Sequence, residues 1–317
     1  MGPHDGTAVL FSPGAATSRR LGFGADALGG LGVRLISLDR PGPGVSAPSP
    51  ARSFPAFAED VQIFAELRGP GRPMMAAHSR GAPFALACAA ASVVGGPAVV
   101  PGADEVSDAR FAGVLPGEPQ RPVDLAVTGP GAAERMFARL TADRMRDLVM
   151  PAGPETDPAV HRHPVFAAAC RHALGEAFAQ GAGGYARDTV LAMGHRGIDL
   201  SSVRVPVHPW YGASDVSHSP DPGAGPADRI PSSVRHVVPD TGGALLWTHY
   251  RDVLRTLLRG SVTWAAVGRA EAGRLAVRSC PPPCALRRRA GALPSCAGRN
   301  SGSPHPDRSY SRRAIRC

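Results

Sequence analysis

The sequence predicts an α/β fold: a doubly wound, mostly parallel sheet with helices on both faces and an inserted helical cap. Short apolar runs that end in Gly or Pro alternate with helix-like segments up to residue 105. Residues 106–196 are mostly helical in pattern, and strand-like runs return at 203–212 and 232–240. Because consecutive parallel strands need a long crossover, usually a helix, this alternation favours a parallel sheet.

The first predicted elements are a strand, a short helix, a second strand and a long helix. "TAVLFSPG" (7–14) and "VRLISLDRPGPG" (33–44) each place an apolar run before Gly and Pro, and the segment between them has room for a short helix. Residues 53–69 carry apolar side chains at helical spacing, with Ser53 as a plausible N-cap and Gly69 at the end. We expect an amphipathic helix there.

A third strand, a buried helix and a fourth strand follow in the pattern, and a last helix is expected over "LLWTHYRDVLRTLLRG". Inserted helices in an α/β chain usually lie over the ends of the strands. The predicted division of the chain is a first core part (1–105), a helical cap (106–196), a second core part (197–260) and a basic tail (261–317).

The composition is that of a globular protein whose charge is concentrated in its tail. The 317 residues are 43% hydrophobic and 19% charged, with 38 Gly and 33 Pro. The eleven arginines after Gly260, set against Glu271 and Asp307, account for the whole net charge of +9. The rest of the chain is therefore neutral overall, which argues against a nucleic-acid-binding surface on the body.

The tail lacks periodicity, and we expect it to be disordered. Its arginines could instead bind nucleic acid, but the segment has few aromatic residues and no recognisable module. Cys280, Cys284, Cys296 and His305 could hold a metal, but their spacing matches no standard ligand set. We predict no nucleic-acid partner and no metal.

Sequence features also bear on the compartment. No stretch reaches the roughly 18 to 20 apolar residues that cross a bilayer, and the N-terminus has no signal pattern. Cys88 and Cys170 lie in apolar runs of the body and are typical of reduced core residues. We expect a cytoplasmic protein with no membrane partner; nothing in the sequence indicates an oligomeric state.

The segment "MMAAHSRGAP" (74–83) places a lone serine between a strand and a helix. A nucleophile on a tight strand-to-helix turn needs small residues around it, in the pattern small-x-Ser-x-small. Ala77, Ser79 and Gly81 fit that pattern. A serine that caps a helix has the same local sequence, so Ser79 is a candidate nucleophile with N-capping as the alternative.

The chain resembles the α/β hydrolase family over about residues 5–260. "LISLDRPGPGVSAPSP" is similar to that family's strand followed by D-x-P-G-x-G-x-S, and "VLFSPGA" stands where the family has an apolar strand before its oxyanion loop. The resemblance implies that the backbone N–H groups of Ala15 and Arg80 stabilise an oxyanion.

The resemblance also implies an acid and a histidine. "VPVHPWYGASD" is similar to the family's seventh strand and places Asp215 where the acid is expected. The family has Gly-His after its eighth strand, but Gly243 stands there. We predict His249 as the general base, because a loop tightened by two glycines could bring the start of the last helix over the sheet. His78 and His218 are the weaker candidates.

Three further features leave alternatives open. His161 and His163 could suggest a metal, but a solvated loop is favoured. The side chain of Arg80 could meet an anionic substrate group or face solvent. The family has an antiparallel strand pair before the strand at 7–12, which this sequence lacks, so we expect the strand at 33–38 to be an uncovered edge.

The function that the resemblance implies is serine-dependent hydrolysis of a small ester-like or amide-like substrate, through an acyl-enzyme and without a cofactor. The predicted partner is thus a small-molecule substrate. The alternative is a catalytically impaired small-ligand binding protein on the same fold, whose base was lost at Gly243.

Overall fold

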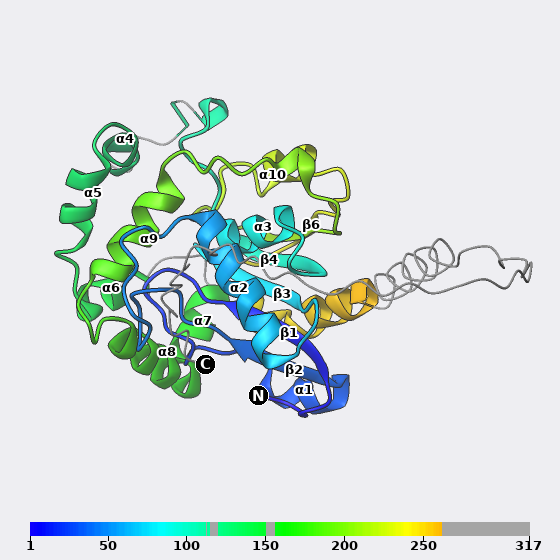
Figure 1. The fold of residues 1–317 in the computed structure, drawn as a ribbon. Helices are drawn as coiled ribbons and strands as arrows, with labels where there is room; N and C mark the ends of the chain where they lie inside the picture. The colour runs from blue at the N-terminus through cyan, green and yellow to red at the C-terminus, as the bar shows by residue number, and fades with distance from the viewer. Residues whose placement is uncertain (112, 115–119, 150–155, 262–317) are drawn as a thin grey trace, which may run out of the picture. The chain divides into compact units, whose positions relative to one another are not determined.

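Six strands form the centre of this computed structural model, in the spatial order β2-β1-β3-β4-β5-β6 (Figure 1). Every neighbouring pair is parallel, as predicted. The structure describes residues 1–111, 113–114, 120–149 and 156–261, so the predicted tail lies outside the described residues apart from Ser261. The strands are β1 (Thr7–Ser12), β2 (Val33–Ser37), β3 (Met74–Ser79), β4 (Gly96–Gly102), β5 (His208–Gly212) and β6 (His236–Val238).

Helices cover both faces of this sheet, because the central strands are apolar on both sides. Successive side chains of a strand point to opposite faces. Val9 and Phe11 of β1 therefore share one core cluster with Leu254 and Leu257, while Leu10 between them is also fully buried. The core helices are α1 (Ala25–Leu31), α2 (Phe54–Arg68), α3 (Ala82–Ala90), α10 (Ala224–Arg229) and α11 (Leu245–Thr248), followed by a helical segment over residues 250–261.

The local signals for α2 act as the sequence predicts. The Ser53 side chain accepts a hydrogen bond from the Ala56 amide at 3.2 Å, which satisfies one of the open donors at the helix start. Gly69 ends the helix with φ of 71°, a left-handed conformation that glycine adopts without a steric cost. The last predicted helix differs, because it is interrupted at His249, which ends α11 before the next helical segment begins.

The strand order has a switch point between β1 and β3. The chain moves from β1 to β2 on one side, and then from β3 through β6 on the other. In open α/β sheets, ligands bind in the crevice at the carboxyl ends of the strands at such a point. The loop after β1, which contains Ala15, and the end of β3, which is Ser79, meet there.

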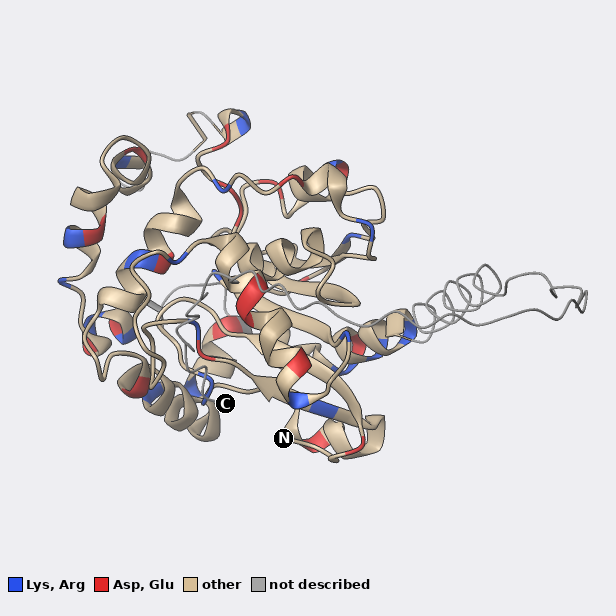
Figure 2. Ribbon diagram, viewed as in Figure 1, with Lys and Arg blue, Asp and Glu red and all other residues tan. Residues whose placement is uncertain are grey.

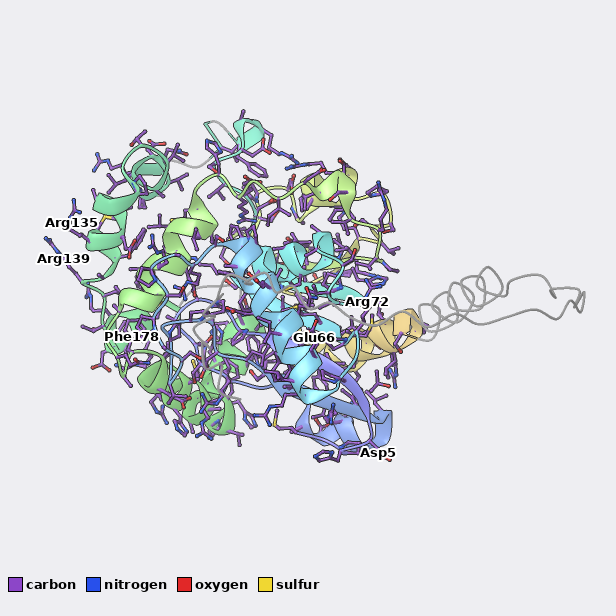
Figure 3. All side chains as sticks on the ribbon, viewed as in Figure 1. Asp5, Glu66, Arg72, Arg135, Arg139 and Phe178 are labelled. Carbon is purple, nitrogen blue, oxygen red and sulfur yellow. The ribbon has the colours of Figure 1, made fainter. Side chains whose placement is uncertain are left out.

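A block of helices is inserted between β4 and β5, as predicted, and appears in green in Figure 1. Charged residues lie mainly on helices and loops in Figure 2, and Arg34 is the one charged residue of the six strands. Arg135 and Arg139 are exposed on the outer side of the block (Figure 3). The block contains α4 (Gln120–Thr128), α5 (Pro130–Phe137), α6 (Ala142–Val149), α7 (Thr156–Arg162), α8 (Pro164–Ala177) and α9 (Gly183–Met193).

The edge strand β2 is not left uncovered, contrary to expectation. It does lie at the edge of the sheet, and no antiparallel pair precedes β1 in the described chain. The Met1 ammonium donates to the Leu35 carbonyl at 2.8 Å, and the Leu35 amide donates to the Met1 carbonyl at 2.9 Å. The first residues of the chain thus satisfy part of the strand edge that would otherwise be open to another chain.

Two further expectations concern the described part of the chain. Cys88 and Cys170 are both buried and unpaired, as predicted. Across the described residues, no helix is both long enough and apolar enough to cross a membrane.

Candidate active site

Ser79 lies on a sharp turn at the end of β3. Its φ is 51°, in the left-handed region that non-glycine residues rarely adopt. A Cβ on Gly81 would overlap the backbone carbonyl of Ser12, so only glycine fits this position. Strained positions of this kind are concentrated at active sites. The local geometry is that of a nucleophile turn, whereas a serine that caps a helix would have extended backbone angles.

Two backbone donors lie beside Ser79. Ala15 and Arg80 both line the cavity that contains the serine, and among the described residues neither amide donates a hydrogen bond. A Cβ on Gly14 would lie 3.3 Å from the Ser79 Cβ, which shows how closely the loop after β1 approaches the serine. Unpaired backbone N–H groups at such a place can stabilise a developing oxyanion.

The cavity has a volume of about 380 Å³. Its apolar side chains come mainly from the cap and from α11, and they include Phe166, Leu174 and Trp247. Its titratable groups besides Arg80 are those of His78, Asp157, His161, Cys170 and His218. Mostly apolar walls with a few convergent polar groups are typical of small-molecule sites.

Asp215 pairs with His218, three residues further along the same loop. The Asp215 Oδ2 atom lies 2.8 Å from His218 Nδ1, and the carboxylate also accepts from the Ser217 amide at 2.9 Å. Burial raises the pKa of Asp215, but the hydrogen bonds and the attraction of the imidazole outweigh it and lower the pKa to about 2. Asp215 is therefore an anion that holds the His218 ring by one nitrogen.

The backbone of this loop is also anchored. The His218 carbonyl accepts from the Asp104 amide at 2.9 Å, and the Ser219 hydroxyl donates to the Asp104 carboxylate at 2.9 Å. These contacts tie the loop after β5 to the loop after β4. His218 and Ser79 line the same cavity without a hydrogen bond between them. In apo structures catalytic hydrogen bonds are often long or poorly aligned and tighten only when substrate is bound.

Gly243 leaves the space that His218 occupies. A Cβ on Gly243 would lie 2.8 Å from the His218 Cε1 atom and 3.1 Å from its Nδ1 atom. A side chain at position 243 and the His218 ring thus compete for one volume. The resemblance in sequence placed the family's histidine at 243, and in this chain an imidazole reaches the same place from the neighbouring loop.

His249, the residue that the sequence favoured as the base, lies elsewhere. It ends α11, and its Nδ1 atom lies 2.9 Å from the hydroxyl of Thr248. It does not line the cavity, and it makes no hydrogen bond to Ser79 or Asp215. Ala15, Ser79 and Arg80 line one cavity, and Asp215 reaches it through His218. His249 lies outside this site.

His78 lies beneath the site as a neutral imidazole. Burial lowers its pKa to about 3, with a further contribution from repulsion by His218. Its ring packs edge-on against Trp247 at 4.7 Å and against His218 at 5.5 Å. The Nε2 atom is buried and has no hydrogen-bond partner among the described residues.

The cap supplies a carboxylate that the sequence reasoning missed. Asp157 of α7 is 3% exposed and accepts from the amides of Gly243 at 2.7 Å and Ala244 at 3.0 Å. It therefore fixes the loop after β6 from above. Nothing in its local sequence marks it, because the contact joins residues that are 86 and 87 positions apart.

The structure also shows where the side chains of His161 and Arg80 lie. His161 is not solvated: it is 8% exposed, lines the cavity and stacks on Phe166 at 5.6 Å. Arg80 faces the cap, where its Nη1 atom donates to Thr189 and lies 3.5 Å from the Tyr185 hydroxyl. No carboxylate among the described residues is paired with Arg80.

Comparisons with solved structures identify the fold. No protein-family model and no curated protein sequence matches the chain. An enol-lactonase from Burkholderia xenovorans is 19% identical, with a TM-score of 0.60 over 82% of this chain and 94% of that one. An esterase from Thermogutta terrifontis is 19% identical, with a TM-score of 0.59 over 82% and 90%. An esterase from a Rhodococcus species is 20% identical, with a TM-score of 0.56 over 82% and 92%. The chain therefore has the α/β hydrolase fold.

Proposed function

We propose that this protein is a serine hydrolase that cleaves small ester-like or amide-like substrates through an acyl-enzyme. One observation carries the proposal: a serine on a strained turn and an imidazole paired with a buried carboxylate line the same cavity. Nucleophile, base and orienting acid are the three parts that activate a hydroxyl near neutral pH.

The proposed first step uses His218 as the base in place of His249. The Ser79 oxygen attacks the substrate carbonyl while His218 takes its proton through the ring nitrogen that Asp215 does not hold. The amides of Ala15 and Arg80 donate to the oxyanion that forms. Asp215 stabilises the imidazolium by its negative charge, without itself accepting the proton.

Collapse of this intermediate completes acylation. His218 returns its proton to the leaving alcohol or amine, and the acyl group stays on Ser79 as an ester. A water molecule then repeats the attack, with His218 again as base, and releases the carboxylic acid and the free serine. No step needs a cofactor.

The cavity favours a small, mostly apolar acyl group. Its volume of about 380 Å³ is near the lower end of ligand pockets, and Phe166, Cys170 and Leu174 of α8 lie along it. The structural relatives named above include an enol-lactonase and two esterases. Esters and lactones with a short apolar acyl part are therefore the first substrates to test.

A small-ligand binding protein with impaired catalysis is the alternative, and the absence of a hydrogen bond between Ser79 and His218 favours it. A fluorophosphonate probe separates the two, since it labels a serine only when the serine is activated. For a hydrolase we expect labelling of the wild type that is lost in Ser79→Ala, together with hydrolysis of p-nitrophenyl acetate.

The experiment distinguishes a hydrolase from a binding protein only if each variant is folded. Circular dichroism of each variant shows whether it is folded. A folded wild type that neither takes up the probe nor hydrolyses the ester would overturn the hydrolase and leave the binding protein. Labelling that persists in Ser79→Ala would place the nucleophile elsewhere.

A further inference from the structure

Arg40 is a buried cation directly behind the proposed oxyanion loop. It follows β2 in the "DRPG" segment, and its side chain is 2% exposed. Its Nη1 atom donates to the Pro13 carbonyl at 2.7 Å, and its Nη2 atom donates to the Gly14 carbonyl at 3.0 Å. Charge-assisted hydrogen bonds such as these are roughly twice as strong as neutral ones.

The second of these bonds fixes the direction of a proposed catalytic donor. The Gly14 carbonyl and the Ala15 N–H belong to one peptide unit, and in a planar trans peptide the two point in opposite directions. The described chain contains no cis peptide bond. The Thr17 hydroxyl also donates to this carbonyl, at 3.2 Å. Holding the carbonyl on Arg40 and Thr17 therefore turns the Ala15 N–H the other way, toward the cavity that Ala15 lines.

The same guanidinium is tied to the cap. Its Nε atom donates to the Asp188 carboxylate of α9 at 2.8 Å, and both side chains are 2% exposed. Buried partners of this kind are held rigidly, because breaking the pair would leave an uncompensated charge in the interior. Arg40 thus joins the cap helix to the peptide beside Ser79.

We propose that Arg40 is a positioning residue that orients the Gly14–Ala15 peptide as an oxyanion donor, and that Asp188 holds it in place from the cap. This inference rests on the proposed hydrolase function. Arg40 does not touch the reacting atoms. Its contribution appears in the transition state, where the oxyanion forms, more than in substrate binding.

The chain offers a matched control in Arg52. This residue pairs with the same Asp188 at 3.2 Å, and its side chain is also 2% exposed. Its hydrogen bond goes to the Gly184 carbonyl of the cap at 2.8 Å, and among the described residues it makes no hydrogen bond to the loop after β1. Substitution of Arg52 therefore disturbs the same buried ion pair without releasing the oxyanion peptide.

The test compares Arg40→Lys and Arg40→Met with Arg52→Lys and Arg52→Met. The measurements are kcat and KM for p-nitrophenyl acetate, the rate of fluorophosphonate labelling at Ser79, and the unfolding temperature. We expect the Arg40 variants to lose about 10- to 100-fold in kcat and in labelling rate with little change in KM, since removing one oxyanion donor outright costs about 10²- to 10³-fold. We expect the Arg52 variants to keep both rates within a few-fold while their unfolding temperature falls comparably.

Arg40→Lys keeps the charge but cannot span both carbonyls, so it carries the comparison if Arg40→Met does not fold. Equal losses in the Arg40 and Arg52 variants, or unchanged rates in folded Arg40→Lys, would overturn the positioning role. A wild type that is not labelled at Ser79 would instead overturn the proposed function.

Discussion

The loops after β5 and β6 end at the same rim of the sheet but carry opposite kinds of residues. The first holds Asp215 and His218, and the second holds Gly242 and Gly243. They are joined directly, since the Ser214 amide donates to the Thr241 carbonyl at 3.0 Å. The loop after β5 can supply an imidazole because the loop after β6 has no side chain in the way: a Cβ at 243 would lie 2.8 Å from the His218 ring.

The largest effect should come from removing the imidazole from the loop after β5. Replacing His218 by Ala should lower kcat about 10³-fold, the range of a lost general base, while His249→Ala should change it by less than about threefold. Rates of ester hydrolysis and of probe labelling measure both. The assignment of the base fails if His249→Ala loses more activity than His218→Ala.

The features of the fold that depend on local signals could be predicted from the sequence. Alternating apolar runs and caps such as Ser53 and Gly69 are local signals, and the elements they predict form as expected. Ser79 lies on the turn that its small neighbours indicated. These features depend on residues close together in the chain, so periodicity and turn chemistry are enough to find them.

The pairing of His218 with Asp215 could not be predicted from local signals in the same way. The position of the imidazole depends on which loop tips meet over the sheet, and on whether α11 continues past Thr248. The available signal was a pair of facts: a glycine at 243 and a histidine three residues after Asp215. Asp157 gave no signal at all, because its partners lie in a distant loop.

A smaller effect should appear in the stability of the protein at acidic pH, through the imidazole of His78 beneath the two loops. Its pKa is about 3 when folded and 6.5 when unfolded, so the unfolded chain binds a proton first as the pH falls. The contribution of the neutral His78 side chain to the free energy of unfolding is complete above pH 6.5 and is lost as the pH falls toward 3. At pH 5 the loss is about 2 kcal/mol.

The variant His78→Leu should therefore show a free energy of unfolding that falls less between pH 7 and pH 5 than that of the wild type, by about 2 kcal/mol. Urea unfolding at the two pH values measures this difference. His249→Leu is the matched control and should keep the wild-type pH dependence. Identical pH dependence in His78→Leu and the wild type would show that His78 is not the acid-sensitive group.

The smallest effect should follow from Gly243→Ala. The backbone at 243 does not have a positive φ, so an alanine is strained only by its contact with His218. We expect the ring to shift away from Asp215 and kcat to fall about tenfold, since misplacing a catalytic group by 1 Å costs up to about 10²-fold. Gly30→Ala, at a glycine whose Cβ would meet nothing within 4 Å, is the control. Unchanged activity in Gly243→Ala would mean that the two loops do not compete for space.

The Asp215–His218 pairing has a consequence for how such a site can be transferred or lost. Two of the three proposed triad members lie within four consecutive residues. Deletion of this loop would therefore remove both, and its exchange for another loop would replace both. A short graft of this segment onto a related scaffold with glycine at the facing position would carry both at once. Loss of the same segment would leave Ser79 on its strained turn without a base to take its proton.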